Sequence, residues 1–187
     1  ALSIYPRTEL LKDQLAETFK RSRMLDQALR DNGKRPILMG AFFGSTPTTA
    51  DFNSVKNKWD RLRGSFHCPW FSCPKCGGNL IWRDEDLNNQ LERLNCIQAN
   101  CNTIVDDTQL VLTRSSLAKK PPDLLFTTTE MLNQRMSDIQ LRKLFGLGQR
   151  RDQKPHFILL DEAHTYAGIN GAQAALVLRR WRHLLNA

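Results

Sequence analysis

Residues 156–164 of the chain read HFILLDEAH, an apolar run that ends in two adjacent acids. The apolar run predicts a buried strand over residues 156–160. In a parallel sheet, functional groups gather in the loops that follow the carboxyl ends of the strands. Asp161 and Glu162 therefore stand where carboxylates would meet a bound metal ion.

Apolar runs and helical patterns alternate on the amino-terminal side of this segment. Strands are predicted over residues 2–6, 36–43 and 123–127. Helices are predicted from an N-cap at Thr8 to a stop at Gly33 and over residues 130–144; a last helix, 171–185, follows the acids. Near-continuous apolar strands separated by helices indicate an α/β fold, a parallel sheet with helices on both faces.

The length of 187 residues allows one domain, or one domain with a small insert. Hydrophobic residues make up 41% and charged residues 25% of the chain, which excludes wholesale disorder. There is no apolar run of the ~20 residues that a membrane span needs, and no basic start followed by an apolar stretch suggests a signal peptide. We expect a cytoplasmic protein with no membrane partner and, because residue 1 is Ala, a piece of a longer chain.

The net charge of +8 is unevenly distributed. Residues 1–63 carry 12 basic and 7 acidic side chains, and residues 106–187 carry 12 and 8. The middle segment, residues 64–105, carries 3 basic and 4 acidic side chains and contains all the cysteines. A basic excess of this kind favours a nucleic-acid partner, although many basic proteins are merely soluble.

Four of the five cysteines form two closely spaced pairs, Cys73 with Cys76 and Cys96 with Cys101. Two such pairs, about 15–20 residues apart, are typical of a tetrahedral zinc site, because each pair supplies two thiolates from one turn. We therefore predict a structural Zn²⁺ held by these four cysteines in a zinc ribbon with strands near residues 79–83 and 92–94. Cys68 is either a free thiol or a substitute for one of the four ligands.

Three segments resemble motifs of superfamily 2 DEAD/DEAH-box helicases. They are residues 5–14 (YPRTELLKDQ), residues 122–132 (PDLLFTTTEML) and residues 160–166 (LDEAHTY), which look like motifs Ia, Ic and II of the first RecA-like domain. Gly168, Gly171, Ala172, Leu178, Arg179 and Arg180 extend the resemblance to a branch of bacterial repair and phage-defence helicases. The resemblance implies a partial RecA-like domain, residues 1–63 and 106–187, interrupted by the zinc ribbon at 64–105.

The resemblance also implies roles for individual residues. Asp161 would coordinate the Mg²⁺ of a bound ATP, Glu162 would activate water for attack on the γ-phosphate, and His164 would link the nucleotide site to the second RecA-like domain. Contacts with the backbone of one nucleic-acid strand would come from Arg7, Thr8, Gly44, Thr128 and Thr129. The implied partners are nucleic acid, DNA in preference to RNA, and the rest of the helicase chain, including its phosphate-loop segment and second RecA-like domain.

Two motifs depart from the family pattern. The first reads Pro6-Arg7-Thr8, where the family has Pro-Thr-Arg, and Thr128 and Thr129 replace the usual Asn-Pro. The sequence also contains no G-x-x-x-x-G-K-[ST] phosphate loop. We therefore expect the full-length parent, in DNA repair or antiviral defence, to hydrolyse ATP and this chain alone to be inactive.

Two other functions remain open. The zinc ribbon is an alternative binding module for nucleic acid or protein, in which Trp70, Phe71 and Trp82 either stack on bases or complete a small core. A degenerate scaffold without chemistry is the third alternative. The arginines at 179, 180 and 182 are interpreted as a solvated helix surface rather than as an anion-binding face.

Overall fold

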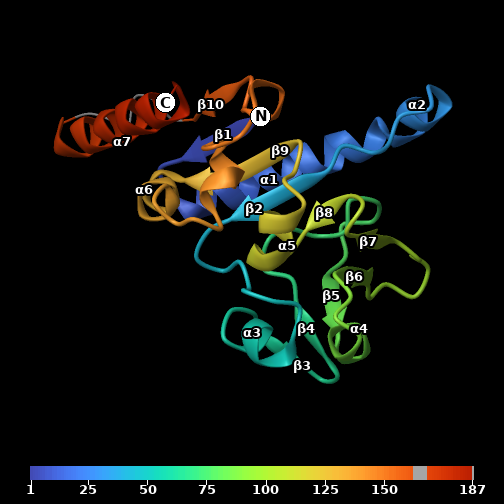
Figure 1. Ribbon diagram of the computed structural model, residues 1–187. Coiled ribbons are helices and arrows are strands. Elements are labelled where there is room, and N and C mark those ends of the chain that lie inside the picture. Colours follow the sequence, from blue (N-terminus) through green and yellow to red (C-terminus); the bar gives the residue numbers. More distant parts are fainter. Residues whose placement is uncertain (162–167, 187) are drawn as a thin grey trace.

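The computed structural model describes residues 1–161 and 168–186, and these residues form two sheets (Figure 1). The first sheet has five strands in the order β10-β1-β9-β2-β8, and every neighbouring pair is parallel. The second sheet has the order β3-β4-β5-β6-β7 and is antiparallel. The predicted α/β class with a small separate β unit is confirmed.

The strands of the parallel sheet are β1 (Leu2–Tyr5), β2 (Met39–Phe42), β8 (Leu110–Val111), β9 (Leu124–Thr128) and β10 (Ile158–Leu160). Around it lie α1 (Thr8–Met24), α2 (Asp26–Asp31), α5 (Arg114–Lys119), α6 (Thr129–Arg135), α7 (Gly168–Asn186) and the 3₁₀ turns η1 (Arg142–Phe145) and η2 (Arg151–Gln153). The antiparallel unit contains β3 (Arg61–Leu62), β4 (Ser65–His67), β5 (Leu80–Arg83), α4 (Asp84–Asn88), β6 (Arg93–Cys96) and β7 (Ile104–Asp106), and α3 (Phe52–Lys56) precedes it in the chain. None of the described helices has the length and hydropathy that a bilayer span requires.

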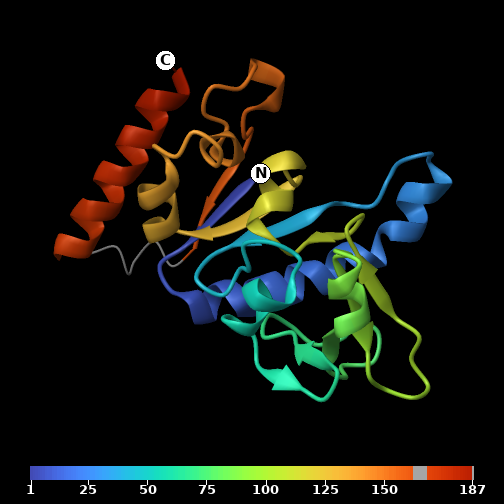
Figure 2. The same ribbon diagram turned by 60° about the horizontal axis from the view of Figure 1, so that its bottom comes forward.

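The alternation of side chains along the parallel strands builds one apolar cluster on each face of the sheet. In β9, Leu125 joins one cluster and Phe126 joins the other. The Phe126 face is covered by α1 and the antiparallel unit, and the Leu125 face by α5, α6, η1 and α7. In both views α7 and the antiparallel unit lie on opposite sides of the parallel sheet (Figure 1 and Figure 2).

Strand β10 differs from the buried strand that the sequence predicts. It pairs with β1 and forms an edge of the sheet, and its three residues are 39%, 54% and 41% exposed. The preceding Phe157 is 71% exposed. The prediction of a buried strand is wrong for the described residues because α7 packs on α6, η1 and the turn at Gly146 and leaves the apolar side chains of β10 uncovered.

The antiparallel unit docks on α1 and on the loop that follows β2. The ring of Phe71 lies 4.6 Å from that of Phe19 on α1. The indole nitrogens of Trp59 and Trp70 donate hydrogen bonds to Ser45, to its carbonyl and its hydroxyl respectively, each at 3.0 Å. Aromatic packing and two directed hydrogen bonds therefore connect the unit to the parallel sheet.

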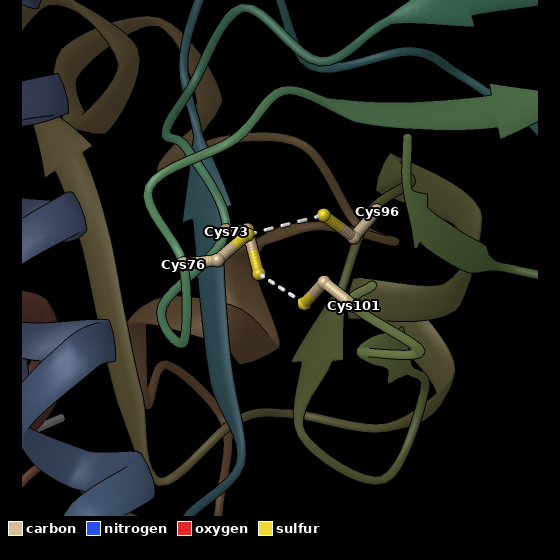
Figure 3. Close-up of side chains that lie close together, drawn as sticks. All are labelled: Cys73, Cys76, Cys96 and Cys101. Atoms are coloured by element: carbon tan, nitrogen blue, oxygen red, sulfur yellow. Dashed lines mark hydrogen bonds between the residues drawn. The ribbon is translucent and has the colours of Figure 1, made fainter. Parts of the chain in front are cut away.

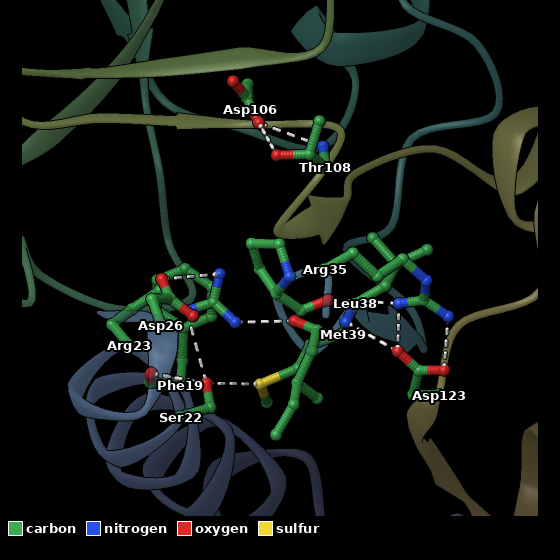
Figure 4. Close-up of polar contacts among 12 residues, drawn as sticks. Phe19, Ser22, Arg23, Asp26, Arg35, Leu38, Met39, Asp106, Thr108 and Asp123 are labelled. Carbon is green, nitrogen blue, oxygen red and sulfur yellow. Dashed lines mark hydrogen bonds and ion pairs between the residues drawn. The ribbon is translucent and has the colours of Figure 1, made fainter. Parts of the chain in front are cut away.

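Polar contacts connect α1, β2 and β9 near the amino ends of the strands (Figure 4). Asp123, just before β9, accepts two hydrogen bonds from Arg35 at 2.6 and 2.8 Å and one from the backbone N–H of Leu38 at 2.9 Å. Arg23 of α1 donates to the carbonyl of Ile37 at 2.6 Å and lies 3.5 Å from Asp26. These contacts align the amino ends of two neighbouring parallel strands.

All three predicted helices have different bounds in the structure, and the last of them, predicted over residues 171–185, is α7, Gly168–Asn186. Thr8 is the first residue of α1, and the N-cap is Arg7, whose side chain forms no capping hydrogen bond. The helix predicted over residues 130–144 ends at Arg135, because Asp138 accepts hydrogen bonds from the backbone of Gln140 and Leu141 and starts a turn. Side-chain competition of this kind is common for Asp.

Candidate functional site

The Cys73–Cys76 pair lies on a tight turn that two glycines make possible. The carbonyl of Cys73 accepts a hydrogen bond from Gly77 N–H, and the N–H of Gly78 points at the Cys76 sulfur at 3.4 Å. Gly77 has a φ of +73°, a conformation that side chains disfavour. At Gly78 a Cβ would lie 2.4 Å from the Gln98 side chain, so a larger residue would force that side chain to move.

The second pair comes from the end of β6 and from the loop after it. Cys96 is the last residue of β6, and its N–H donates to the carbonyl of Thr103. Cys101 N–H donates to the carbonyl of Gln98, and the Cys101 sulfur lies 3.1 Å from the Thr103 hydroxyl. The hydrogen bonds to Thr103 bring this loop back beside β6, so that both sulfurs face the first turn.

The four sulfurs converge into one cluster (Figure 3). All lie within 4.8 Å of one another, with Cys73 to Cys101 at 3.7 Å and Cys76 to Cys96 at 3.4 Å. A tetrahedral zinc ion with Zn–S bonds of about 2.3 Å places its sulfurs ~3.8 Å apart. The spacing therefore fits a metal ion such as zinc at the centre.

The thiols differ in their tendency to ionise. Hydrogen bonds from the hydroxyl and backbone of Thr103 lower the pKa of Cys101 to about 6, whereas desolvation raises the pKa of Cys96 to about 12. Thiolates are the form that binds metal, so a divalent ion would displace the remaining protons. The cluster can hold a metal ion on chemical as well as geometric grounds.

Cys68 is not part of this cluster. Its side chain is buried, and burial raises the pKa of its thiol to about 11. Its backbone N–H donates to the carbonyl of Leu80, which fixes it within the antiparallel unit. Of the two alternatives for Cys68, the structure supports a free, buried thiol.

The helicase-like residues come to the carboxyl edge of the parallel sheet. Because all its strands point the same way, their following loops lie side by side in the strand order. Asp161 follows β10, Arg7 follows β1, Thr129 follows β9 and Gly44 follows β2. Residues from four separate segments thus line one edge, which we call the carboxyl edge.

Asp161 occupies the β10 end of this edge. Its backbone N–H donates to the carbonyl of Ile4 at 3.3 Å. Burial, and secondarily the charge of Asp161, raise the pKa of the nearby Tyr5 hydroxyl, which also accepts a hydrogen bond from Ser3. Glu162 and His164, predicted as the other catalytic residues, lie outside the described residues.

Arg7 and Thr129 line a cavity of about 730 Å³ between the end of β1, α6 and α7. Thr128 is only 8% exposed, and its hydroxyl accepts the N–H of Met131 as the N-cap of α6. Gly44 is exposed, its φ is not positive, and a Cβ there would touch nothing within 4 Å. Neither the backbone conformation nor the packing of the described residues therefore requires glycine at position 44.

The cavity also receives side chains that sequence reasoning did not assign to binding. Asn133 of α6 and Gln173 and Arg180 of α7 line it together with Arg7. Arg180 also donates to the hydroxyl of Ser137 at 2.9 Å. The available signal was helical spacing, because Gln173, Val177 and Arg180 share one face of α7.

The aromatic residues of the antiparallel unit are not presented to a ligand. Trp70, Phe71 and Trp82 are 2%, 9% and 0% exposed, and the Trp82 indole donates to the carbonyl of Leu91. Of the two interpretations of these rings, the core role is confirmed.

The chain is 27% identical, over 222 residues, to Druantia protein DruE of Escherichia coli (strain UMEA 4076-1). The match covers 96% of this chain but 11% of the relative, so the chain spans about a tenth of the length of the relative it matches. No protein-family model and no solved structure matches the chain significantly.

Proposed function

We propose that the chain is a nucleic-acid-contacting part of an ATP-dependent helicase or translocase. The observation that carries this proposal is the convergence of Asp161, Arg7, Thr129 and Gly44 on the carboxyl edge of one parallel sheet. These residues come from the segments that resemble helicase motifs. The similarity to the Druantia protein supports a nucleic-acid-related role in a helicase-related protein.

In this proposal the carboxyl edge holds the backbone of one strand. Arg7 is exposed beside the cavity and supplies a guanidinium for a phosphate. Gly44 allows a close approach to its backbone, which would explain a glycine where the fold demands none. Thr128 supports the strand-binding carboxyl edge indirectly, because its hydroxyl caps the amino end of α6.

In the full-length parent, Asp161 would hold the magnesium ion of ATP, and Glu162 would activate the attacking water. The position of Asp161 just after β10, at the edge where parallel sheets bind ligands, fits that role. The phosphate loop would come from another segment of the parent. The described chain is therefore expected to bind a strand without hydrolysing ATP.

The four-cysteine cluster is proposed to hold one structural zinc ion. The alternative, that the zinc ribbon itself grips nucleic acid, is disfavoured by the burial of its tryptophans and by its slight acidic excess. The ribbon would instead support the loop that carries Gly44, because Trp59 and Trp70 both donate to Ser45.

The test is binding of fluorescent single-stranded DNA and RNA 15-mers, followed by anisotropy over a salt series. Arg7→Gln should weaken DNA binding about tenfold, since a charge-assisted hydrogen bond contributes roughly 1.5–3 kcal/mol. Gly44→Leu should also weaken binding while leaving the melting temperature unchanged. Lys34→Gln is the matched control, because Lys34 is exposed before β2, at the opposite edge of the sheet.

Equal losses for Arg7→Gln and Lys34→Gln would indicate a diffuse charge effect and overturn the carboxyl-edge assignment. Loss of binding only when Cys73 and Cys101 are both replaced by Ser, with Arg7→Gln silent, would support the zinc ribbon as the contact surface. Tighter binding of RNA than DNA would reverse the expected preference for DNA.

A further inference from the structure

The cavity between the end of β1, α6 and α7 is larger than a contact with a phosphate group requires. Its volume of about 730 Å³ lies within the range of roughly 300–1,000 Å³ that ligand pockets occupy. Helices α6 and α7 lie alongside each other in both views (Figure 1 and Figure 2), and side chains from both line the cavity. A space of this size has room for a whole nucleotide unit.

The α6 wall of the cavity carries a carboxylate and an amide. Glu130 and Asn133 both line the cavity, and because they are three residues apart they share one face of the helix. Gln134 donates a hydrogen bond to Oε1 of Glu130 at 2.9 Å, which orients the carboxylate. Among the described residues no ion pair neutralises Glu130. The α6 wall therefore presents a negative charge, which repels a phosphate group and attracts an N–H donor.

The α7 wall is polar at its two ends and apolar between them. Gln173 is exposed, and its amide offers both donors and an acceptor. Two turns further on, Arg180 donates from Nη2 to the hydroxyl of Ser137 at 2.9 Å, which fixes the guanidinium at the far end. Ala174 and Val177 lie between these two and also line the cavity. They provide an apolar surface against which a flat ring can lie.

The charges of the cavity lining favour a ligand with two different ends. Arg7, after β1, attracts an anionic group, whereas Glu130 on α6 accepts hydrogen bonds from a neutral donor. A nucleotide unit has both, a phosphate and a base edge. Cytosine and adenine carry an exocyclic amino group that donates to an acceptor, whereas thymine presents a carbonyl oxygen at the same place. A carboxylate therefore distinguishes cytosine from thymine.

We propose that this cavity binds one unstacked base of the nucleic-acid strand and prefers a base with an exocyclic amino group. Glu130 accepts a hydrogen bond from the amino group, the amides of Asn133 and Gln173 pair with the rest of the base edge, and Arg7 holds the adjoining phosphate. The inference rests on the proposed function and adds a base preference, which contacts with the strand backbone alone do not give. A free nucleotide carries the same groups, so the experiment separates the two sources.

The test compares the binding of fluorescent oligo(dC) and oligo(dT) 15-mers by anisotropy at neutral pH and equal salt. Wild type should bind oligo(dC) about tenfold more tightly, as expected for one hydrogen bond to a charged group. In Glu130→Gln the ratio of the two dissociation constants should fall to within about twofold of one, because an amide donates to thymine as readily as it accepts from cytosine. Glu85→Gln on α4 removes the same charge outside the cavity and should keep the wild-type ratio.

A second measurement removes the bases from the strand. Asn133→Ala should weaken binding of oligo(dC) about fivefold, as expected for one neutral hydrogen bond. It should leave unchanged the binding of a 15-mer made of abasic sugar-phosphate units, because that strand offers no base edge. Free deoxycytidine monophosphate should raise the melting temperature of wild type no more than deoxythymidine monophosphate does, since a single nucleotide lacks the other strand contacts. Melting curves without ligand identify any variant that is misfolded.

The outcomes separate this inference from the proposed function. If wild type binds no 15-mer, the proposed function fails. If wild type binds oligo(dC) and oligo(dT) equally tightly, the function stands and the base site is wrong. A preference for oligo(dC) that persists in folded Glu130→Gln, or an equal loss of both normal and abasic strands in Asn133→Ala, would also overturn the base site. Equal binding of the two 15-mers together with a melting shift specific to deoxycytidine monophosphate would assign the cavity to a free nucleotide instead of the strand.

Discussion

The two sheets of this chain are stabilised in different ways. The parallel sheet has a cluster of apolar side chains on each face, covered by α1 and the antiparallel unit on one side and by α5, α6 and α7 on the other. The antiparallel unit is smaller, leaves β3 exposed, and concentrates its contacts on three tryptophans and four thiols. Since so small a unit has little apolar area to bury, metal binding is expected to supply much of its stability.

One buried carboxylate joins the two regions. Glu92 precedes β6 and is 8% exposed. It accepts hydrogen bonds from the N–H of Leu112 at 2.6 Å and from the hydroxyl of Thr113 at 2.5 Å, just after β8. The comparison therefore predicts that some substitutions destabilise one sheet only. Others should destabilise the contact between the two sheets at Glu92.

Removal of metal should have the largest effect. Structural zinc sites provide an apparent binding free energy of about 10–16 kcal/mol at neutral pH. A chelator, or Cys73→Ser combined with Cys101→Ser, should therefore unfold the antiparallel unit and leave most of the parallel sheet folded. Metal analysis should find one zinc per chain, and tryptophan fluorescence should report the unfolding. Cys68→Ala is the control and should retain the metal; its loss there would show that the ligand set is wrong.

Truncation of the central indole of the antiparallel unit should come next. Trp82 is fully buried, with its ring centre 5.4 Å from that of Trp59. Trp82→Ala should lower the free energy of unfolding by about 3–5 kcal/mol. Phe126→Ala is the counterpart in the parallel sheet, with a similar cost. Guanidinium unfolding measures both, and zinc titration should show weaker binding for Trp82→Ala only. Equal zinc affinity in the two variants would contradict the prediction that zinc binding depends on the core of the antiparallel unit and not on that of the parallel sheet.

The junction should be sensitive to the charge of Glu92. Glu92→Gln keeps the size but leaves one donor at Thr113 or Leu112 without its acceptor, so the unfolding free energy should fall by about 2 kcal/mol. Glu85→Gln on the exposed side of α4 is the matched control and should change it by less than about 0.5 kcal/mol. Hydrogen exchange should locate the loss at residues 112 and 113. Equal effects of the two substitutions on the free energy of unfolding would show that Glu92 does not stabilise the contact between the two sheets.

The smallest effect concerns the amino ends of the parallel strands. Hydrogen bonds from Arg35 hold the pKa of Asp123 below its usual value. A lowered pKa in the folded state stabilises the protein above the unfolded pKa of about 3.9, and this part is lost as pH falls through the folded pKa. Because the pair is partly exposed, Asp123→Asn should cost about 1 kcal/mol or less at pH 7. Urea unfolding over a series of pH values should show the difference between variant and wild type at pH 7, and the difference should shrink as pH falls below about 3.9.

The sequence predicted the elements that depend on local pattern. Apolar runs placed four of the parallel strands, β1, β2, β9 and β10, and cysteine spacing placed four cysteine sulfurs in one cluster. These features follow from spacing alone, which a single sequence shows directly.

Features that depend on distant pairing could not be predicted in the same way. Glu92 looks like an ordinary surface charge until Thr113 is brought to it by the fold. The contacts of Arg114 with Thr46 and Pro47 depend on β8 pairing with β2 in the sheet. The exposure of β10 depends on its place at the edge, which an apolar run cannot reveal because central and edge strands share the same composition.

That edge has a practical consequence for handling the purified chain. Phe157 and the three residues of β10 form a row of exposed apolar side chains. Among the described residues, β10 pairs with β1 on one side and with no strand on the other. Bare edges of this type recruit further strands from other molecules. Concentrated samples should therefore associate reversibly through this rim, and dilution or mild detergent should keep the chain monodisperse for spectroscopy.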